Sequence, residues 1–328
     1  MQNRPDNGGE IDLERSRERD PEFDVADSLT EPLPTSADGP LAVTTHQGGR
    51  FWPGRESTWY WPFLGLIGVL ADLLFSFLAN VIPFNGQTTD DILTKTKMPF
   101  QPSAWVWAIW VAIFILMAVY VVYMIFPGGR HSDRTRRIGP FFLIVNVANV
   151  LWLFFWHWNQ FLLSLILMAI VLASLAIIYL MANSKDDEGN KPTRTQLLMV
   201  RIPFSVYLGW TTVATLGNLM VWLQHRGWEG APFSLRVWAV IFMIVGLLAA
   251  AAFAAFRQDA AYAIVFVWAY VAVAQHQWDI SKLVSIFAGI GAVVAAGLAV
   301  MAFMLSFDRR AMSGMYVEEH RENPLPLE

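Results

Sequence analysis

The chain has 328 residues, of which 55% are hydrophobic and only 15% are charged. Soluble globular domains carry roughly 25% charged residues, so this composition argues against an ordinary soluble protein and favours one that is solvated by lipid. The chain contains no cysteine. Disulfides, thiolate metal sites, iron–sulfur clusters and cysteine nucleophiles are therefore excluded.

Residues 1–57 are predicted to form a disordered acidic tail. Residues 1–50 hold eleven acidic and five basic side chains, and they lack any apolar periodicity. Such a segment cannot bury enough apolar surface to fold by itself. A cleaved signal peptide would need an apolar stretch near its start, but the first such stretch here comes only after Arg55. The segment from Tyr60 onward is therefore expected to be a retained membrane helix.

Eight apolar runs follow, each close to the ~20 residues that a membrane-spanning helix needs. Short polar or Gly/Pro segments separate them, and charged residues concentrate in these gaps, which is untypical of a soluble helical bundle. We predict an all-α, polytopic transmembrane bundle of about eight helices, followed by a C-terminal tail at residues 308–328. The runs cover residues 59–82, 103–126, 138–157, 160–182, 198–223, 234–256, 260–278 and 281–306.

Lysine and arginine alternate between the gaps, as the positive-inside rule requires. Taken together, the gaps after the second, fourth, sixth and eighth runs hold more basic residues than the others; examples are Arg130, Arg137, Lys185, Arg194 and Arg310. The opposite gaps carry fewer basic residues. This pattern predicts that both termini are cytoplasmic, and it supports an even number of helices.

Aromatic and amide side chains gather in three of the runs. Trp105 and Trp107 open the second run and point roughly 200° apart on an α-helix, so at least one should face the protein. In the third run Asn149 and Trp152 lie one turn apart on one face. An amide inside hydrocarbon needs a partner, so Asn149 should face another helix, as structural glue or as part of a site.

The fifth run carries a longer face of the same kind. Tyr207, Trp210, Ala214 and Asn218 lie at positions i, i+3, i+7 and i+11, which is one continuous helical face. The small residue leaves room beside two aromatic rings. This face is suited to line a flat, apolar ligand site.

In these motifs the sequence resembles the tryptophan-rich sensory protein family, TspO/MBR, which includes the mitochondrial translocator protein. The matching elements are Trp105-Val106, Asn149-x-x-Trp152 with Phe154-Phe155, and Trp210-x3-Ala214-Thr215-x2-Asn218. They occur in the expected order and helices. The resemblance implies a five-helix membrane domain at residues 58–226, and it leaves three additional transmembrane helices at residues 227–307 outside the family pattern.

The resemblance also implies a pocket between the first three helices and the fifth. Its ligand would be a porphyrin, a haem-like tetrapyrrole or another flat hydrophobic molecule, bound by aromatic stacking without a metal or a fixed cofactor. The output would be sensory or transport-related. The expected ligand-binding residues are Trp105, Trp107, Asn149, Trp152, Tyr207, Trp210, Ala214 and Asn218.

An alternative is a proton-coupled secondary transporter of a small solute. Asp72 lies well inside the first run, and an ionisable group there is a functional candidate. It could bind a proton or a cation, or pair with Arg201 at the start of the fifth run. An enzyme is a third alternative, since some family members are reported to degrade porphyrin in light, but no acid–base constellation supports it.

The partners expected are the lipid bilayer and a hydrophobic small molecule, and no feature of the sequence points to nucleic acid. Small residues in the last run, among them Gly289, Gly291 and Ala295, permit close helix packing, either within the chain or between two copies in a homodimer.

Overall fold

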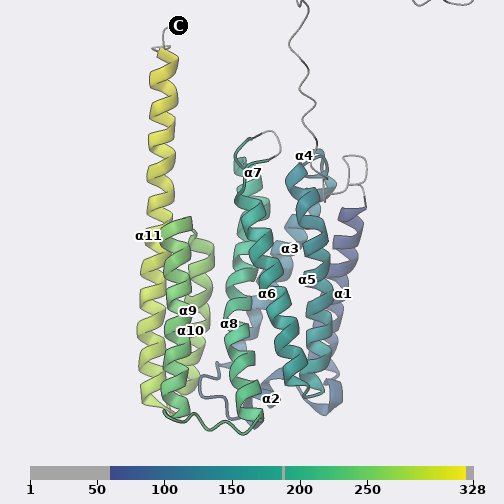
Figure 1. The fold of residues 1–328 in the computed structure, drawn as a ribbon, viewed down its shortest axis with the longest axis vertical. Helices are drawn as coiled ribbons and strands as arrows, with labels where there is room; N and C mark the ends of the chain where they lie inside the picture. The colour runs from purple at the N-terminus through teal and green to yellow at the C-terminus, as the bar shows by residue number, and fades with distance from the viewer. Residues whose placement is uncertain (1–59, 187–188, 323–328) are drawn as a thin grey trace, which may run out of the picture. The chain divides into compact units, whose positions relative to one another are not determined.

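The computed structural model describes residues 60–186 and 189–322, without the side chains of Asn80 and of residues 307–322. The predicted disordered tail lies outside these residues. The described part is helical throughout, with long helices that run side by side (Figure 1). The elements are α1 (Trp61–Val81), η2 (Phe84–Gly86), α2 (Thr89–Lys95), η3 (Ala104–Ala108), α3 (Ile109–Ile125), α4 (Pro127–Arg130), α5 (Asp133–His157), α6 (Phe161–Asn183), α7 (Arg194–Gln196), η4 (Leu197–Arg201), α8 (Ile202–His225), α9 (Leu235–Arg257), α10 (Ala260–Gln277) and α11 (Lys282–Glu322).

The eight predicted apolar runs become eight long helices. Among the helices that the structure describes, seven are long and apolar enough to cross a membrane. The exception is α10, whose 18 residues end in Gln275, His276 and Gln277. This polar end shortens its apolar stretch. The prediction of an all-α membrane bundle is confirmed.

The first five long helices pack against one another through close contacts between neighbours. α5 and α6 form an antiparallel hairpin across the short turn at Trp158–Gln160, as the sequence indicates. α1 packs on α5, where a Cβ added at Gly68 would lie 2.9 Å from the side chain of Asn146. The glycine therefore permits the close approach of these two helices.

The last three long helices pack against one another, and α10 also packs against α8. Of the small residues of α11, Ala295 is buried, and Gly291 lies against the ring of Tyr270 of α10. Gly289, in contrast, faces open space. The small residues thus serve mainly to pack α11 within the chain.

Three short helices lie at the ends of the bundle. α4 and α7 lie at one end, and α2 lies at the opposite end (Figure 1). α2 begins with a capping box, in which the Thr88 hydroxyl accepts from the backbone of Asp91, and the Asp91 carboxylate accepts from the backbone of Thr88 at 2.8 Å. These hydrogen bonds hold the pKa of Asp91 below its ordinary value of 3.8.

Candidate functional site

A cavity of about 80 Å³, which we call the tryptophan cavity, lies among η3, α3, α5, α8 and α10. α2 and the loop after it cover the cavity with Thr89, Leu93 and Met98. Its lining is almost entirely apolar. Five indole rings from three parts of the chain surround it: Trp107, Trp110, Trp152, Trp156 and Trp210.

The indole rings contact one another in arrangements that aromatic pairs favour. Trp107 and Trp210 meet edge to face, with ring centroids 6.0 Å apart and planes at 89°. Trp110 meets Trp210 in the same way at 6.5 Å, whereas Trp152 and Trp156 are stacked at 5.7 Å. The flat rings that line the cavity therefore also pack on one another.

Asn218 ties three helices together beside the cavity. Its Oδ1 accepts from Trp152 Nε1 at 3.0 Å and from Ser164 Oγ at 2.8 Å, while its Nδ2 donates to the Ala214 carbonyl at 3.0 Å. Both ends of the amide are thus occupied by protein groups. Asn218 positions the Trp152 ring and leaves the cavity without a free amide.

Five of the eight expected ligand-binding residues line the tryptophan cavity, namely Trp107, Trp152, Trp210, Ala214 and Asn218. The other three, Trp105, Asn149 and Tyr207, are not among the lining residues. The sequence interpretation also passed over several residues that do line it. Trp110, Trp156, Gly217, Ala269 and Val273 are the main ones.

Trp105 does not line the cavity, because Trp105 and Trp107 point to different sides of their helix. Residues 104–108 form the 3₁₀ helix η3, in which each residue turns by about 120°, so the two side chains lie about 120° apart around its axis. Trp107 faces the cavity. Trp105 instead donates from Nε1 to Gln275 Oε1 at 2.6 Å and meets Trp268 edge to face, both on α10.

Asn149 and Tyr207 contact neighbouring residues rather than the space of the cavity. Asn149 Nδ2 donates to Asp72 Oδ1 at 2.7 Å, which joins α5 to α1. The ring of Tyr207 packs edge to face on Trp110 at 5.9 Å. The Asn149 amide therefore serves as a helix–helix contact, which was one of the two roles that the sequence left open.

Asp72 does not pair with Arg201. Arg201 ends the π-helical segment η4 and forms its ion pair with Asp259, Nε to Oδ2 at 3.2 Å. Asp72 is 3% exposed, and Asn149 donates its hydrogen bond from α5. The pairing of Asp72 with Arg201 is thus wrong, because the acidic partner of Arg201 comes from the start of α10.

A second space of about 400 Å³, which we call the α1–α3 pocket, adjoins the tryptophan cavity. Trp107, Trp110, Trp152 and Thr89 line both spaces, so three indole rings separate them. The outer wall of this pocket includes Phe77 and Val111, which are 60% and 62% exposed. Both belong to helices that are long and apolar enough to cross a membrane.

The comparison with protein families agrees with this architecture. Residues 62–301 match the family described as TSPO-like protein. The chain belongs to the TSPO-like protein family. The residues matched to the TSPO-like family include most of α1 and reach into α11, so they contain every helix that lines the tryptophan cavity. Neither the curated proteins nor the solved structures contain a match to this chain.

The TSPO-like chain is therefore an integral, multi-pass membrane protein whose aromatic cavity lies inside the helix bundle. In the part of the chain that the structure describes, no group of three or more His, Asp or Glu side chains lies close enough together to hold a metal ion. What the cavity offers chemically is apolar contact with flat rings.

Proposed function

We propose that this membrane protein binds a flat hydrophobic ligand of the porphyrin or tetrapyrrole class, with a sensory or transport-related role. The observation that carries the proposal is the enclosure of one cavity by five indole rings. Stacking and edge contacts between aromatic rings contribute about 0.5–1.5 kcal/mol per pair beyond the burial of apolar area. A flat conjugated ligand is the kind of molecule that such a wall favours.

The size of the site bears on how the ligand would enter. The tryptophan cavity alone, at about 80 Å³, is too small for a tetrapyrrole, since small-molecule sites are about 300–1,000 Å³. The α1–α3 pocket adds about 400 Å³ behind Trp107, Trp110 and Trp152. The ligand would therefore occupy both spaces, after these rings turn to join them, and would enter from the lipid side.

Fluorescence titration of the purified protein with protoporphyrin IX tests the proposal. Saturable quenching of tryptophan emission is expected, and Trp210→Ala should weaken it, because Trp210 contacts both Trp107 and Trp110. Trp278→Ala is the matched control, since Trp278 is 56% exposed and lies outside both spaces. The titration is run in the dark, so that light-driven breakdown of porphyrin does not imitate binding. Absence of saturable quenching would exclude the proposal.

A proton-coupled transporter of a small solute is the second candidate, and Asp72 favours it. This carboxyl is buried inside a membrane-spanning helix, with the Asn149 amide as its hydrogen-bond donor. Buried intramembrane carboxyl groups commonly carry protons in transporters. Proteoliposomes should then move protoporphyrin IX in response to a pH gradient, and Asp72→Asn should abolish the dependence on that gradient. Porphyrin transport at the same rate with and without the pH gradient would argue against proton coupling.

We also propose that both termini are cytoplasmic and that the chain forms a homodimer. Residues 58–226 would form a five-helix membrane domain, and residues 227–307 would add three transmembrane helices. The alternation of basic residues between the gaps supports the orientation. Protease digestion of intact cells carrying a tag at either end tests it, since neither tag should be cleaved from outside. Light scattering of the detergent-purified protein tests the homodimer.

A further inference from the structure

α10 supplies one wall of the tryptophan cavity, although it belongs to the three helices that the five-helix pattern leaves unexplained. Ala269 and Val273 both line the cavity. They are four residues apart and therefore lie on one face of the helix. Ala269 is 2% exposed and ends at its Cβ, so the cavity extends to the surface of α10 at this point.

The same helix holds the tryptophan-rich segment η3 in place. The Ser103 amide donates to the Ala272 carbonyl at 3.0 Å, and Trp268 Nε1 donates to the Val106 carbonyl at 2.9 Å. With the bond from Trp105 to Gln275, three hydrogen bonds connect η3 and its N-cap to α10. Trp107 lies within η3, so these bonds with α10 also position the backbone of Trp107, whose ring lines the cavity.

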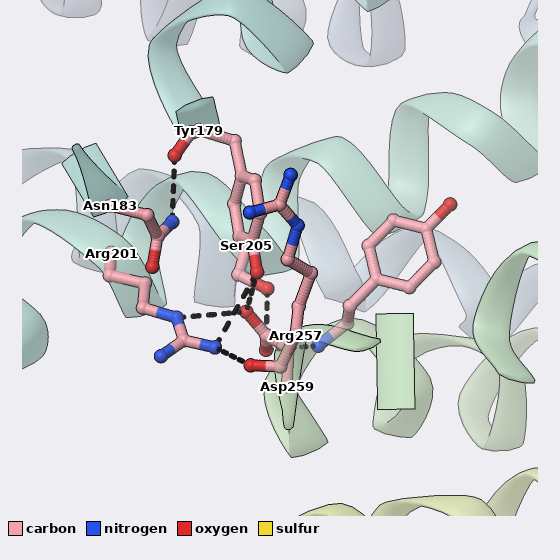
Figure 2. Close-up of polar contacts among 7 residues, drawn as sticks. Tyr179, Asn183, Arg201, Ser205, Arg257 and Asp259 are labelled. Atoms are coloured by element: carbon pink, nitrogen blue, oxygen red, sulfur yellow. Dashed lines mark hydrogen bonds and ion pairs between the residues drawn. The ribbon is translucent and has the colours of Figure 1, made fainter. Parts of the chain in front are cut away.

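The opposite end of α10 is anchored by Asp259, its N-cap residue (Figure 2). The Asp259 carboxylate accepts from Tyr179 Oη of α6 at 2.8 Å and from Ser205 Oγ of α8 at 2.8 Å, in addition to the ion pair with Arg201. Arg201 also donates to the Arg257 carbonyl at 2.6 Å. One carboxylate thus attaches the start of α10 to two helices of the five-helix part.

Between these two anchors α10 approaches α8 closely. A Cβ added at Gly209 of α8 would lie 3.1 Å from the Tyr262 carbonyl oxygen and 3.2 Å from Val265. Only a residue without a side chain permits this separation without a shift. α10 is therefore held at both ends and along its length. These contacts set the distance between its cavity-facing residues and the tryptophans.

We propose that α10 is a size-determining wall of the ligand site, and that α9 and α11, which both pack on α10, help to hold it there. Ala269 and Val273 set how far an apolar ring system can extend from the tryptophans toward α10. This inference rests on the proposed function, since it names the residues that limit the ligand of the same cavity.

A graded series at Ala269 tests the proposal, with protoporphyrin IX as the probe and binding followed by fluorescence quenching in the dark. Ala269→Val should weaken binding moderately, and Ala269→Phe should weaken it by roughly ten-fold or more, because the added ring occupies space that the ligand needs. Val273→Ala, which enlarges the same wall, should leave binding unchanged or strengthen it. Ile264→Phe is the matched control, since Ile264 lies on α10 and is 58% exposed.

The thermal midpoint of each variant without ligand separates a changed site from a damaged fold. If Ala269→Phe unfolds, Ala269→Val and Val273→Ala still test the role of α10. If every variant at Ala269 and Val273 binds the porphyrin as tightly as the unchanged chain, α10 does not limit the ligand. The proposed function is then unaffected. A chain that shows no saturable binding before any substitution overturns the proposed function, and the inference falls with it.

Discussion

Arg201 and Asp259, which are 58 residues apart in the sequence, form the ion pair that joins the start of α8 to the start of α10. Asp259 is 4% exposed, and its carboxylate also accepts hydrogen bonds from Tyr179 and Ser205. The Tyr262 amide is a fourth donor to the carboxylate, so removal of the acid takes away the acceptor of four hydrogen bonds. The cost of such a loss exceeds that of deleting an exposed charge.

Asp259→Ala should therefore lower the free energy of unfolding by about 3–5 kcal/mol, the usual cost of breaking a buried ion pair on one side. Thermal unfolding in detergent measures it. Asp279→Ala is the control, since Asp279 is 93% exposed and its ion pair with Lys282 is 4.0 Å long. That substitution should change stability by about 0–1 kcal/mol. Equal losses in the two variants would contradict a structural role for the Asp259 anchor.

The helical faces in the sequence were enough to place several residues of the candidate cavity. Trp152, Trp210, Ala214 and Asn218 obey α-helical spacing within helices that do form, so their common direction could be predicted. Trp105 could not be assigned in this way, because the spacing shows that Trp105 and Trp107 face different sides but not which of them faces the cavity. The tertiary contact between Trp105 and Gln275 of α10 decides it.

The contribution of α10 was beyond sequence reasoning for another reason. Ala269 and Val273 are ordinary residues of an apolar helix, and only the packing of α10 against α8 brings them to the cavity. The partner of Arg201 likewise depends on tertiary structure, since Asp259 lies outside the apolar runs and reads as a residue of a short loop.

Asn149 and Asp72 give a second prediction about stability. Asn149→Leu should lower the free energy of unfolding by about 1–3 kcal/mol, because the buried Asp72 carboxyl loses its donor. Thermal unfolding is again the measurement. Replacing both residues by leucine should restore part of the loss, since the unsatisfied group is then gone. A double variant that loses as much as the two single variants together would show that the residues do not interact.

The lining of the two spaces predicts a preference between forms of the porphyrin. Neither the tryptophan cavity nor the α1–α3 pocket is lined by a lysine or arginine, and Asp90 lines the pocket. Burying a carboxylate without a cation is unfavourable. Protoporphyrin IX dimethyl ester should therefore bind at least as tightly as the free acid in parallel titrations. Much tighter binding of the free acid would indicate that its carboxylates reach a cation elsewhere.

The capping box of α2 predicts a pH dependence at the end of the bundle that covers the cavity. Thr88 lowers the pKa of Asp91 below 3.8 through hydrogen bonds from its backbone and its hydroxyl. A carboxyl whose pKa is depressed by folding contributes stability above its unfolded pKa, and this contribution is lost as the pH falls through the lower, folded value. The part of the cap's stabilisation that depends on ionised Asp91 should thus be complete at neutral pH and be lost below pH 3.8.

Thr88→Val tests this contribution, because it removes the hydroxyl that donates to Asp91, together with the acceptor of the Asp91 amide. The thermal midpoint of the variant should be lower than that of the unchanged chain near pH 6. The difference should become smaller as the pH falls below 3.8, but it should not vanish, because the bond from the Asp91 amide does not depend on ionisation. Thr96→Val removes a hydroxyl at the other end of α2 that donates to the Ile92 carbonyl, with no carboxylate involved. Its effect should be the same at both pH values. A difference for Thr88→Val that persists unchanged into acid would mean that the ionised form of Asp91 does not stabilise α2.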